Sequence, residues 1–258
     1  MFKAWKFVLF FLLCLVLALL LNLPIQQVLA RVNLPGTVQL NGVDGTLFDG
    51  RVAALTLNQF PLLGVRYRFM PSCLAALKLC YLIDYDQGRI QLAYDAVNGD
   101  SELGGSRVEY PVAELLGHFP TMTLPVKPSG SLRLEIDDMS MLQNKLAAVN
   151  GRLQWRSLGV DQGDIQINIG DYQVDFRGDA TRYEFDFSDL DAQLDVAGDG
   201  SVTADGQYKI DVRVSAKSTI DSQVRSVLEL IGKRSSPNKY RIEQQGRLPP
   251  QITRQLFP

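Results

Sequence analysis

Paired carboxylates and two nearby cysteines are the residues of this sequence whose types and spacing could do chemistry. The acids include the neighbours Asp137 and Asp138, and two carboxyl groups can hydrolyse a glycosidic bond when one of them is buried and kept protonated. Alternation along the chain places most paired acids on solvated faces or in turns, which does not favour such a site. A nucleophilic triad needs a base, and the single histidine, His118, lies beside a proline-rich stretch, where we expect a loop residue.

The stretch GVDGTLFDG (42–50) places Asp44 and Asp49 close together and raises the question of a metal loop. Calcium loops space their acids more densely, and Leu47 and Phe48 cannot coordinate an ion. Asp before Gly is typical of tight turns, so we expect a turn, a short strand and a second turn here. The chain also has no phosphate-loop or dinucleotide fingerprint. We therefore predict a protein that is not an enzyme and holds no metal or cofactor.

Cys73 and Cys80 lie in the segment PSCLAALKLC, and their spacing bears on whether they form a disulfide. In one continuous helix, residues seven apart would be about 10 Å from each other, which is too far for a disulfide. A short helical turn from Pro71 to Leu77, leading into a strand at Leu79, would bring them together. The pair therefore favours a structural disulfide, and two free buried thiols remain the alternative.

The first 30 residues differ in composition from the rest of the chain. Lys3 and Lys6 precede the apolar run FVLFFLLCLVLALLL, which contains Cys14. Extended from Trp5 to Leu23, the run is about 19 residues long, enough for a membrane helix with a cytoplasmic N-terminus. A cleaved signal peptide ending at residues 28–30 is the alternative. Both hypotheses export residues 31–258.

The charge of the exported part limits its partners. Without Lys3 and Lys6 it carries 24 Lys and Arg residues against 28 Asp and Glu residues. This acidic balance argues against nucleic acid and against electrostatic attraction to an acidic lipid surface.

After residue 31 the dominant pattern is strict alternation of apolar and polar residues, which is typical of half-buried antiparallel strands. It runs through Ile90–Tyr94, Leu132–Ile136, Ile165–Ile169, Tyr172–Phe176, Tyr183–Phe187, Leu194–Val196 and Tyr208–Val214. We expect glycine pairs to separate these strands as turns: Asn41-Gly42, Asp44-Gly45, Asp49-Gly50, Gly104-Gly105, Asn150-Gly151, Gly170-Asp171, Asp199-Gly200 and Asp205-Gly206. The predicted fold class is mainly β, a curved antiparallel sheet or meander that follows one transmembrane helix.

Helical signals are few. Residues 112–116 are expected to form one helical turn, and residues 140–148 are ambiguous. Val224, Val227, Leu228 and Ile231 recur at helical spacing, with Asp221 and Gly232 as the ends. The stretch 118–128 is rich in proline and predicts an extended connector. The expected organisation is an anchor over 1–30 and a β-rich domain over 31–258, with portions 31–117 and 129–258 on either side of the connector.

Three segments in order after the apolar run carry a resemblance to a known family. GTLFDGRVAALTLN (45–58) is similar to a G-T-L-W-x-G element followed by a strand, with Phe48 in place of the usual Trp. LPVKPSGSLRLEI (124–136) resembles a proline-bearing lead into a Gly-initiated strand, and NGRLQWRSLGV (150–160) resembles a G-x-L-x-W strand. The motif residues are Gly45, Thr46, Leu47, Phe48, Gly50, Gly151 and Trp155. Together these segments resemble protein N of the type II (general) secretion pathway.

The resemblance implies a single-pass inner-membrane protein with a periplasmic β domain. It would be a non-enzymatic accessory of the machine that moves folded proteins across the outer membrane. The implied partners are inner-membrane platform components of that machine, including proteins C, L and M.

The architecture leaves a second function open. A long curled sheet with one dry face could form an AsmA-like groove that binds or transfers lipid acyl chains, or its apolar residues could fill a closed sandwich. In the groove hypothesis the lining residues are Tyr94, Ile167, Phe176, Phe185 and Ile210.

Overall fold

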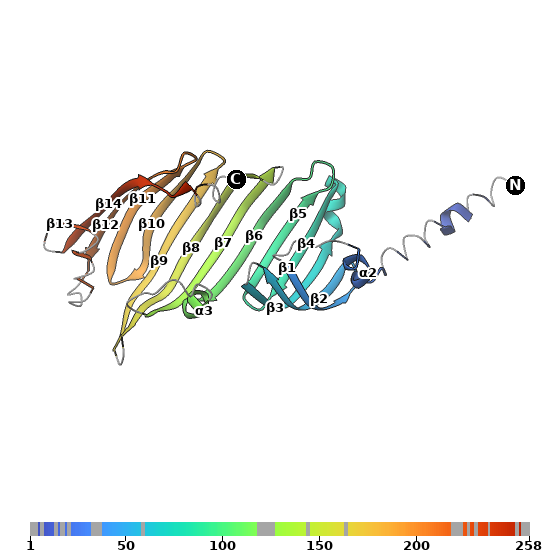
Figure 1. Cartoon of the computed structure of the whole chain (residues 1–258), viewed down its shortest axis with the longest axis horizontal. Coiled ribbons are helices and arrows are strands. Elements are labelled where there is room, and N and C mark those ends of the chain that lie inside the picture. The colour runs from blue at the N-terminus through green and yellow to red at the C-terminus, as the bar shows by residue number, and fades with distance from the viewer. Residues whose placement is uncertain are drawn as a thin grey trace. The chain divides into compact units, whose positions relative to one another are not determined.

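A computed structural model gives the structure of the chain. It describes residues 22–31, 38–57, 60–117, 127–142, 145–162, 165–217, 232–236 and 238–250, together with 5, 8–12, 15, 19, 224–225, 228–229 and 253. The chain forms two compact units, Met1–Ala93 and Tyr94–Pro258, whose elements are labelled in Figure 1. Of the predicted connector, residues 118–126 lie outside the described residues, and Lys127 and Pro128 begin a strand.

The described residues between 5 and 19 are helical and expose their apolar side chains. Trp5 is 72% exposed and Phe11 is 69% exposed. Within the described part of the chain, no helix has both the length and the apolar character needed to cross a membrane. The transmembrane helix expected from Trp5 to Leu23 includes residues that lie outside the described ones, so it stays a prediction.

The N-terminal unit is a short helix followed by an antiparallel sheet in the order β1-β2-β3-β4-β5. Its elements are α2 (Ile25–Leu29), β1 (Val38–Gly45), β2 (Asp49–Leu57), β3 (Phe60–Met70), the 3-10 helix η1 (Pro71–Ala76), β4 (Lys78–Tyr85) and β5 (Gly88–Asp95). As predicted, a helical turn begins at Pro71 and leads into a strand. Val52 and Val65 pair across β2 and β3 and are both buried.

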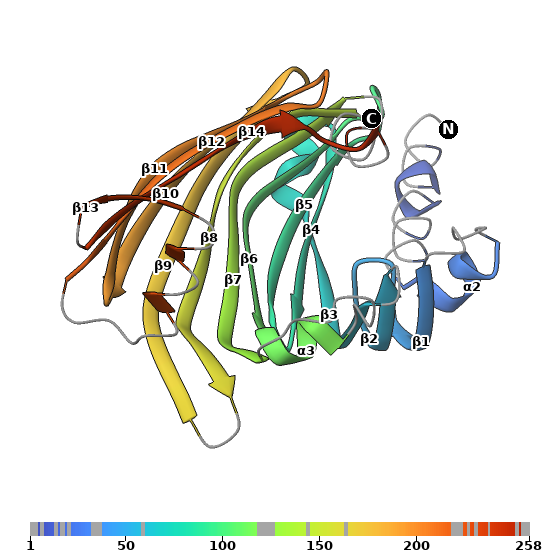
Figure 2. The same cartoon turned by 60° about the vertical axis from the view of Figure 1, so that its left-hand side comes forward.

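The C-terminal unit is a larger antiparallel sheet in which strand order follows chain order from β6 to β12, and β14 then pairs with β12. Figure 2 shows its long strands bending along their length. The elements are β6 (Ser101–Pro111), α3 (Val112–Gly117), β7 (Lys127–Leu142), β8 (Lys145–Gln162), β9 (Ile165–Asp179), β10 (Arg182–Ala192), β11 (Leu194–Thr203), β12 (Gln207–Ala216), β13 (Lys233–Ser236) and β14 (Lys239–Arg247).

Period-two alternation located parts of β7, β9, β10, β11 and β12, and α3 begins where the helical turn was expected. The ambiguous stretch 140–148 contributes the end of β7 and the start of β8, which pair with each other. Within the C-terminal unit the described strands form a single sheet, so they do not make the sandwich that was one expectation.

Most of the glycine pairs expected as turns lie inside strands instead. Gly104-Gly105 is within β6, Asn150-Gly151 within β8, Gly170-Asp171 within β9 and Asp199-Gly200 within β11, whereas Asp205-Gly206 is a turn. The two strands expected on either side of Gly170 are therefore one strand, β9. Gly170 has a φ of 118° at a register shift between β9 and β10, which a side chain would strain.

One compact core lies at the C-terminal end of the sheet. Leu194, Val212, Val214 and Tyr240 pack with Leu228, which is helical together with Val224. Of the helix predicted over 221–232, Asp221, Val227 and Ile231 lie outside the described residues. The described helical residues cover β11, β12 and β14 on one face.

Candidate functional site

Within the stretch 42–50, residues 46–48 form a reverse turn between β1 and β2, which pair with each other. Thr46 Oγ1 accepts hydrogen bonds from the N–H groups of Phe48 (3.2 Å) and Asp49 (3.3 Å). Asp44 Oδ1 accepts one from the Gly45 N–H (2.9 Å). The short strand expected between two turns is wrong, because Thr46 closes residues 46–48 into the turn itself. Asp44 caps a backbone N–H group, and Asp49 begins β2. The stretch is therefore not a ligand loop.

The same turn is attached to the segment that follows the apolar N-terminal run. Leu47 N–H donates to the Leu23 carbonyl (3.2 Å), and Pro24 pairs with Thr46 in an isolated bridge. Gln26 Nε2 in α2 donates to the Val43 carbonyl (2.9 Å). Three contacts therefore join residues 23–26 to the end of β1.

An aromatic cluster fixes the turn against β3 and β4. The Phe48 and Phe69 rings pack edge to face with their centroids 5.2 Å apart. The Phe69 and Tyr81 ring centroids are 5.5 Å apart. The Phe69 N–H donates to the Phe48 carbonyl (2.7 Å), and the Tyr67 hydroxyl donates to the Thr46 carbonyl (2.6 Å). Burial raises the pKa of Tyr67 and of Tyr81 above the ordinary value. The cluster keeps both phenols as neutral hydrogen-bond donors.

Gly45 and Gly50 leave no room for a side chain at this turn. A Cβ on Gly45, whose φ is 110°, would lie 2.5 Å from the Asp49 carbonyl oxygen. A Cβ on Gly50 would lie 2.3 Å from the Tyr67 hydroxyl. Gly45, Thr46, Phe48 and Gly50 therefore act in packing, and sequence reasoning missed their partners Tyr67 and Tyr81, for which alternation within β3 and β4 was the available signal.

Cys73 and Cys80 form a disulfide in the structure, with their Cα atoms 5.9 Å apart. Leu77 lies between them in the left-handed conformation, with φ 57°, and its N–H donates to the Leu74 carbonyl (3.0 Å). This conformation turns the chain back on itself, so Cys80 enters β4 opposite Met70 of β3. The disulfide closes a protruding loop at the end of β3 and acts in structure.

Gly151 and Trp155 both lie in β8 and act in packing. A Cβ on Gly151 would lie 2.4 Å from the Glu135 carbonyl oxygen and 2.8 Å from Cζ of Phe176. The Phe176 ring therefore lies over the glycine. Trp155 Nε1–H donates to the Ser129 carbonyl (3.1 Å), which ties β8 to β7.

The register of the C-terminal unit brings apolar residues into continuous rows on one face. Phe176 is directly opposite Phe185, Phe185 opposite Gly200, and Gly200 opposite Ile210. A neighbouring row contains Leu134, Leu153, Val174, Phe187, Gly198, Val212 and Ile242.

Three of the five predicted groove residues therefore share one row, and each of their side chains is only half-buried. Ile167 lies in β9, but its side chain is outside the described residues. Tyr94 lies in β5 and is 43% exposed, outside the strands that form the row.

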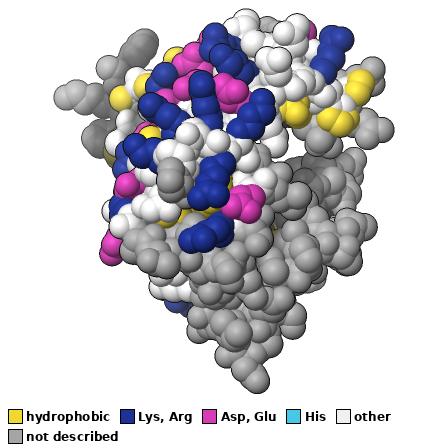
Figure 3. Space-filling model, turned by 90° about the vertical axis from the view of Figure 1, so that its left-hand side faces the viewer, with side chains coloured by type: hydrophobic (Ala, Val, Ile, Leu, Met, Phe, Trp, Pro, Cys, Tyr) yellow, Lys and Arg dark blue, Asp and Glu magenta, His cyan; other side chains and the backbone are white. Residues whose placement is uncertain are grey.

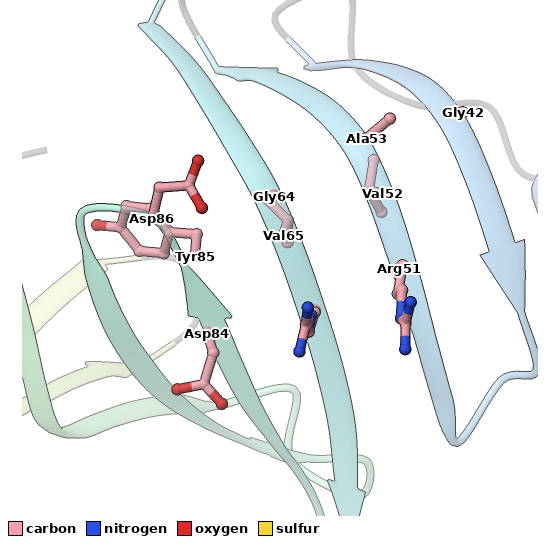
Figure 4. A pocket seen from close by; sticks show the side chains of 10 residues that line it. Gly42, Arg51, Val52, Ala53, Gly64, Val65, Asp84, Tyr85 and Asp86 are labelled. Carbon is pink, nitrogen blue, oxygen red and sulfur yellow. The ribbon is translucent and has the colours of Figure 1, made fainter.

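An open hollow of about 450 Å³, lined by apolar and charged residues, lies on the N-terminal unit. Figure 4 shows Gly64 between Asp86 on one side and Arg51 on the other. Arg51 and Arg66 are directly opposite each other on β2 and β3, and Arg66 is opposite Asp84. Gly64 has a φ of 64°, and a Cβ there would lie 2.5 Å from Asp86 Oδ1. This mixed and open surface lacks the convergent groups of a catalytic pocket.

Part of the charged surface of the C-terminal unit consists of ion pairs between neighbouring strands. Figure 3 shows Lys and Arg side chains with acidic ones between them. Arg241 contacts Asp211 at 2.6 Å and Glu243 at 2.9 Å. The hydrogen bond from Arg241 holds the pKa of Asp211 below its usual range. Mutual pairing of this kind leaves little net field for an anionic ligand.

A second ionic group joins three strands of the same sheet. Lys217 Nζ contacts Asp189 at 2.8 Å and Asp195 at 3.0 Å. Burial opposes ionisation of Asp189, but hydrogen bonds from Lys217 and from the Val196 N–H outweigh it, so the pKa lies below its usual range. Burial, with a smaller contribution from Asp189, raises the pKa of Tyr172 to about 12. Near neutral pH Asp189 therefore stays ionised and Tyr172 stays neutral.

No group of three His, Cys, Asp or Glu residues within the described ranges is arranged to hold a metal ion. His118 lies outside the described residues. The features that remain are surfaces: the N-terminal turn, the disulfide loop, the apolar rows and the paired charges.

Comparison with known proteins identifies the family of this chain. The family model described as type II secretion system (T2SS), protein N, matches residues 20–243. A type II secretion system protein N from Aeromonas hydrophila is 22% identical over 240 residues, covering 89% of this chain and 93% of that protein. No solved structure is detectably similar. The match spans both units and includes every motif residue named above, so the chain belongs to the type II secretion system protein N family.

Proposed function

We propose that this protein is an inner-membrane accessory of the type II secretion machine, with its N-terminus in the cytoplasm and both β units in the periplasm. Family membership is the observation that carries the proposal, because the matched segment covers most of the chain. In this role the protein supports assembly of the machine through surface contacts, and it needs no catalytic site.

The N-terminal residues support the membrane part of the proposal. The described helical residues from Trp5 to Leu19 expose large apolar side chains, and burying such side chains away from water is favourable. Lys3 and Lys6 precede the apolar run that begins at Phe7, as the positive-inside rule requires of a cytoplasmic end. The bonds from Leu47 to Leu23 and from Gln26 to Val43 hold the end of β1 and the turn after it close to the point where the chain leaves the apolar run.

Co-purification from cells that contain the secretion machine tests the proposed role. The full chain is expected to retain platform proteins such as C, L and M. A variant whose residues 1–23 are replaced by an unrelated membrane helix should retain them equally if the β units make the contacts. Loss of secretion on deletion of the protein, with no platform protein retained by either form, would contradict a scaffold role.

The apolar rows of the C-terminal unit favour a second candidate function, the binding of lipid acyl chains. Phe176, Phe185 and Ile210 form one half-buried row. Ile210 packs against the core that includes Leu228, and the described strands of the unit provide no second sheet over the row. Gly200 has no side chain and so leaves a gap in the row between Phe185 and Ile210. A Cβ there would lie only 3.3 Å from the Phe187 ring. An extended apolar strip of this kind matches the shape of an acyl chain.

A photo-crosslinking residue placed at Phe185 tests lipid binding in membranes of intact cells. Phospholipid adducts are expected at position 185 and not at Asp186, the adjacent exposed residue on the opposite face of β10. Equal labelling at both positions, or labelling at neither, would exclude an acyl-chain site on this row.

A further inference from the structure

The loop closed by the disulfide exposes an unusual amount of apolar surface. We call residues 71–80 the leucine tip. Leu74 is 49% exposed, Leu77 is 69% exposed and Leu79 is 37% exposed, and the alanines at 75 and 76 are exposed as well. The segment contains no acidic residue, and its one charged side chain is Lys78.

The leucine tip is held in this exposed arrangement by its own backbone. The Cys73–Cys80 disulfide joins both ends of the loop, and Leu77 has a positive φ of 57°. A left-handed conformation is unfavourable for leucine and ordinarily falls to glycine or asparagine. The fold therefore keeps an apolar side chain at a turn where a small or polar residue would be easier to accommodate. With most of its surface in water, that side chain contributes little to the packing of the unit.

The leucine tip lies at the same end of the N-terminal sheet as the segment that leaves the apolar run. Leu23 and Pro24 contact the turn at Thr46 and Leu47. The next residue of that turn, Phe48, accepts a hydrogen bond from Phe69, two residues before η1. Two residues of strand cover about 7 Å, so the tip begins close to the place where residues 23–26 join the sheet.

We propose that the leucine tip inserts into the surface of the membrane that holds the N-terminal run. The inference rests on the proposed membrane placement of residues 5–23 and adds a second contact point to it. Leu74, Leu77 and Leu79 enter the boundary between headgroups and acyl chains, where apolar side chains leave water. Lys78 extends its charged end toward the headgroups. Two attachments at one end of the sheet fix the orientation of the N-terminal unit against the bilayer.

Fluorescence quenching of the full chain in vesicles tests the proposal. The vesicles contain phosphatidylethanolamine and phosphatidylglycerol, with or without bromine on the acyl chains. Trp5 and Trp155 are replaced by Phe, and a single Trp is introduced as Leu77→Trp or, independently, as Leu74→Trp. Each tip variant should show blue-shifted emission and lose most of its intensity in brominated lipid.

Leu63→Trp is the matched control, because Leu63 is a 47% exposed leucine of β3 in the same unit near the opposite end of the strand. It should keep its intensity in brominated lipid and respond to aqueous iodide. A tip Trp that responds to iodide and not to bromine would overturn the proposal. Protection of the tip Trp from both quenchers would also overturn the proposal. In that case protein, as in contact with a second copy of the chain, would cover the leucines in place of lipid.

Trp5 alone, in a Trp155→Phe background, distinguishes failure of the tip from failure of the membrane placement. If brominated lipid quenches Trp5 but neither tip variant, the N-terminal run is in the membrane and the tip inference is wrong. If Trp5 is not quenched, the proposed membrane placement fails independently of the tip.

Discussion

Replacing Phe48 by Ala should loosen the turn at 46–48 by about 2–4 kcal/mol. Truncation of a fully buried Phe costs about 3–5 kcal/mol, and the Phe48 side chain is only half-buried, which lowers the burial contribution to about half. The edge-to-face contact with Phe69 at 5.2 Å adds about 0.5–1.5 kcal/mol. The main-chain bond from the Phe69 N–H to residue 48 remains in the variant and can report on the opening of the turn.

Hydrogen exchange measures this opening locally, in the intact full-length chain in detergent or lipid. Because about 1.4 kcal/mol corresponds to a tenfold change, the Phe69 amide should exchange roughly 30- to 700-fold faster in Phe48→Ala. Amides of β12 in the C-terminal unit should be unchanged, because exchange reports local stability and β12 belongs to the other unit.

A conservative variant gives the control for this prediction. Phe48→Trp keeps an aromatic ring of the kind that the family motif usually carries, and we expect exchange at Phe69 within a few-fold of the wild type. If Phe48→Ala also leaves exchange unchanged, the ring does not hold the turn, and the aromatic cluster would have to serve as a contact for another molecule.

Substitutions at the disulfide, at Gly151 and at Asp189 probe packing and charge elsewhere in the chain. The unfolded, unreduced chain should show one reactive thiol, that of Cys14, and replacing Cys73 and Cys80 by Ala should cost about 2.5 kcal/mol for a loop of about 8 residues, measured by urea unfolding. Two further free thiols before reduction would contradict the disulfide. Gly151→Ala should cost at least about 1–3 kcal/mol, because its Cβ would lie 2.4 Å from a carbonyl oxygen of β7; thermal unfolding equal to wild type would show that β8 shifts freely. Asp189 has a lowered pKa, so its contribution is present above the unfolded pKa of about 3.9 and is lost as the pH falls through the folded value. Asp189→Asn should therefore be less stable than wild type at pH 7 by about 1–2 kcal/mol, with the difference shrinking towards pH 3, and a difference independent of pH would refute the assignment.

Alternation was sufficient to locate parts of several strands, because each of them has one face in water and one against apolar neighbours. Leu132, Leu134 and Ile136 do lie on one face of β7, and their partners in β8 include Trp155 and Leu153. The bend at Pro71 could also be predicted, because the cysteine spacing requires one if a disulfide forms.

The strand boundaries were harder to predict, because glycine has two roles in this fold. Asp199-Gly200 has the composition of a turn, yet Gly200 is a strand residue between Phe185 and Ile210. A glycine that makes space for a large side chain on the neighbouring strand cannot be distinguished, in one sequence, from a glycine that allows a positive φ. The lengths of β8 and β9 depend on this distinction.

The candidate binding surfaces could not be predicted in detail, because they depend on contacts between residues far apart in the chain. The order of the strands determines that Phe176, Phe185 and Ile210 share a row, and the pairing of β3 with β4 determines that Tyr67 and Tyr81 meet the turn at Thr46. Period-two patterns give the face of each residue but not its neighbour across the sheet. The exposure of Leu77 could likewise not be predicted, because an apolar residue beside a disulfide is ordinarily expected to be buried.

The strand order of the C-terminal unit has a consequence for how this protein is made. From β7 to β12 every strand pairs with the strands just before and after it in the chain, so the sheet can grow one hairpin at a time as the chain emerges. Growth ends where β14 pairs with β12 and the exposed residues of β13 form the last edge, much as a polar terminal repeat ends a solenoid. The length of the unit is therefore an adjustable property, since a hairpin could be added or removed in the middle and the apolar rows would remain continuous.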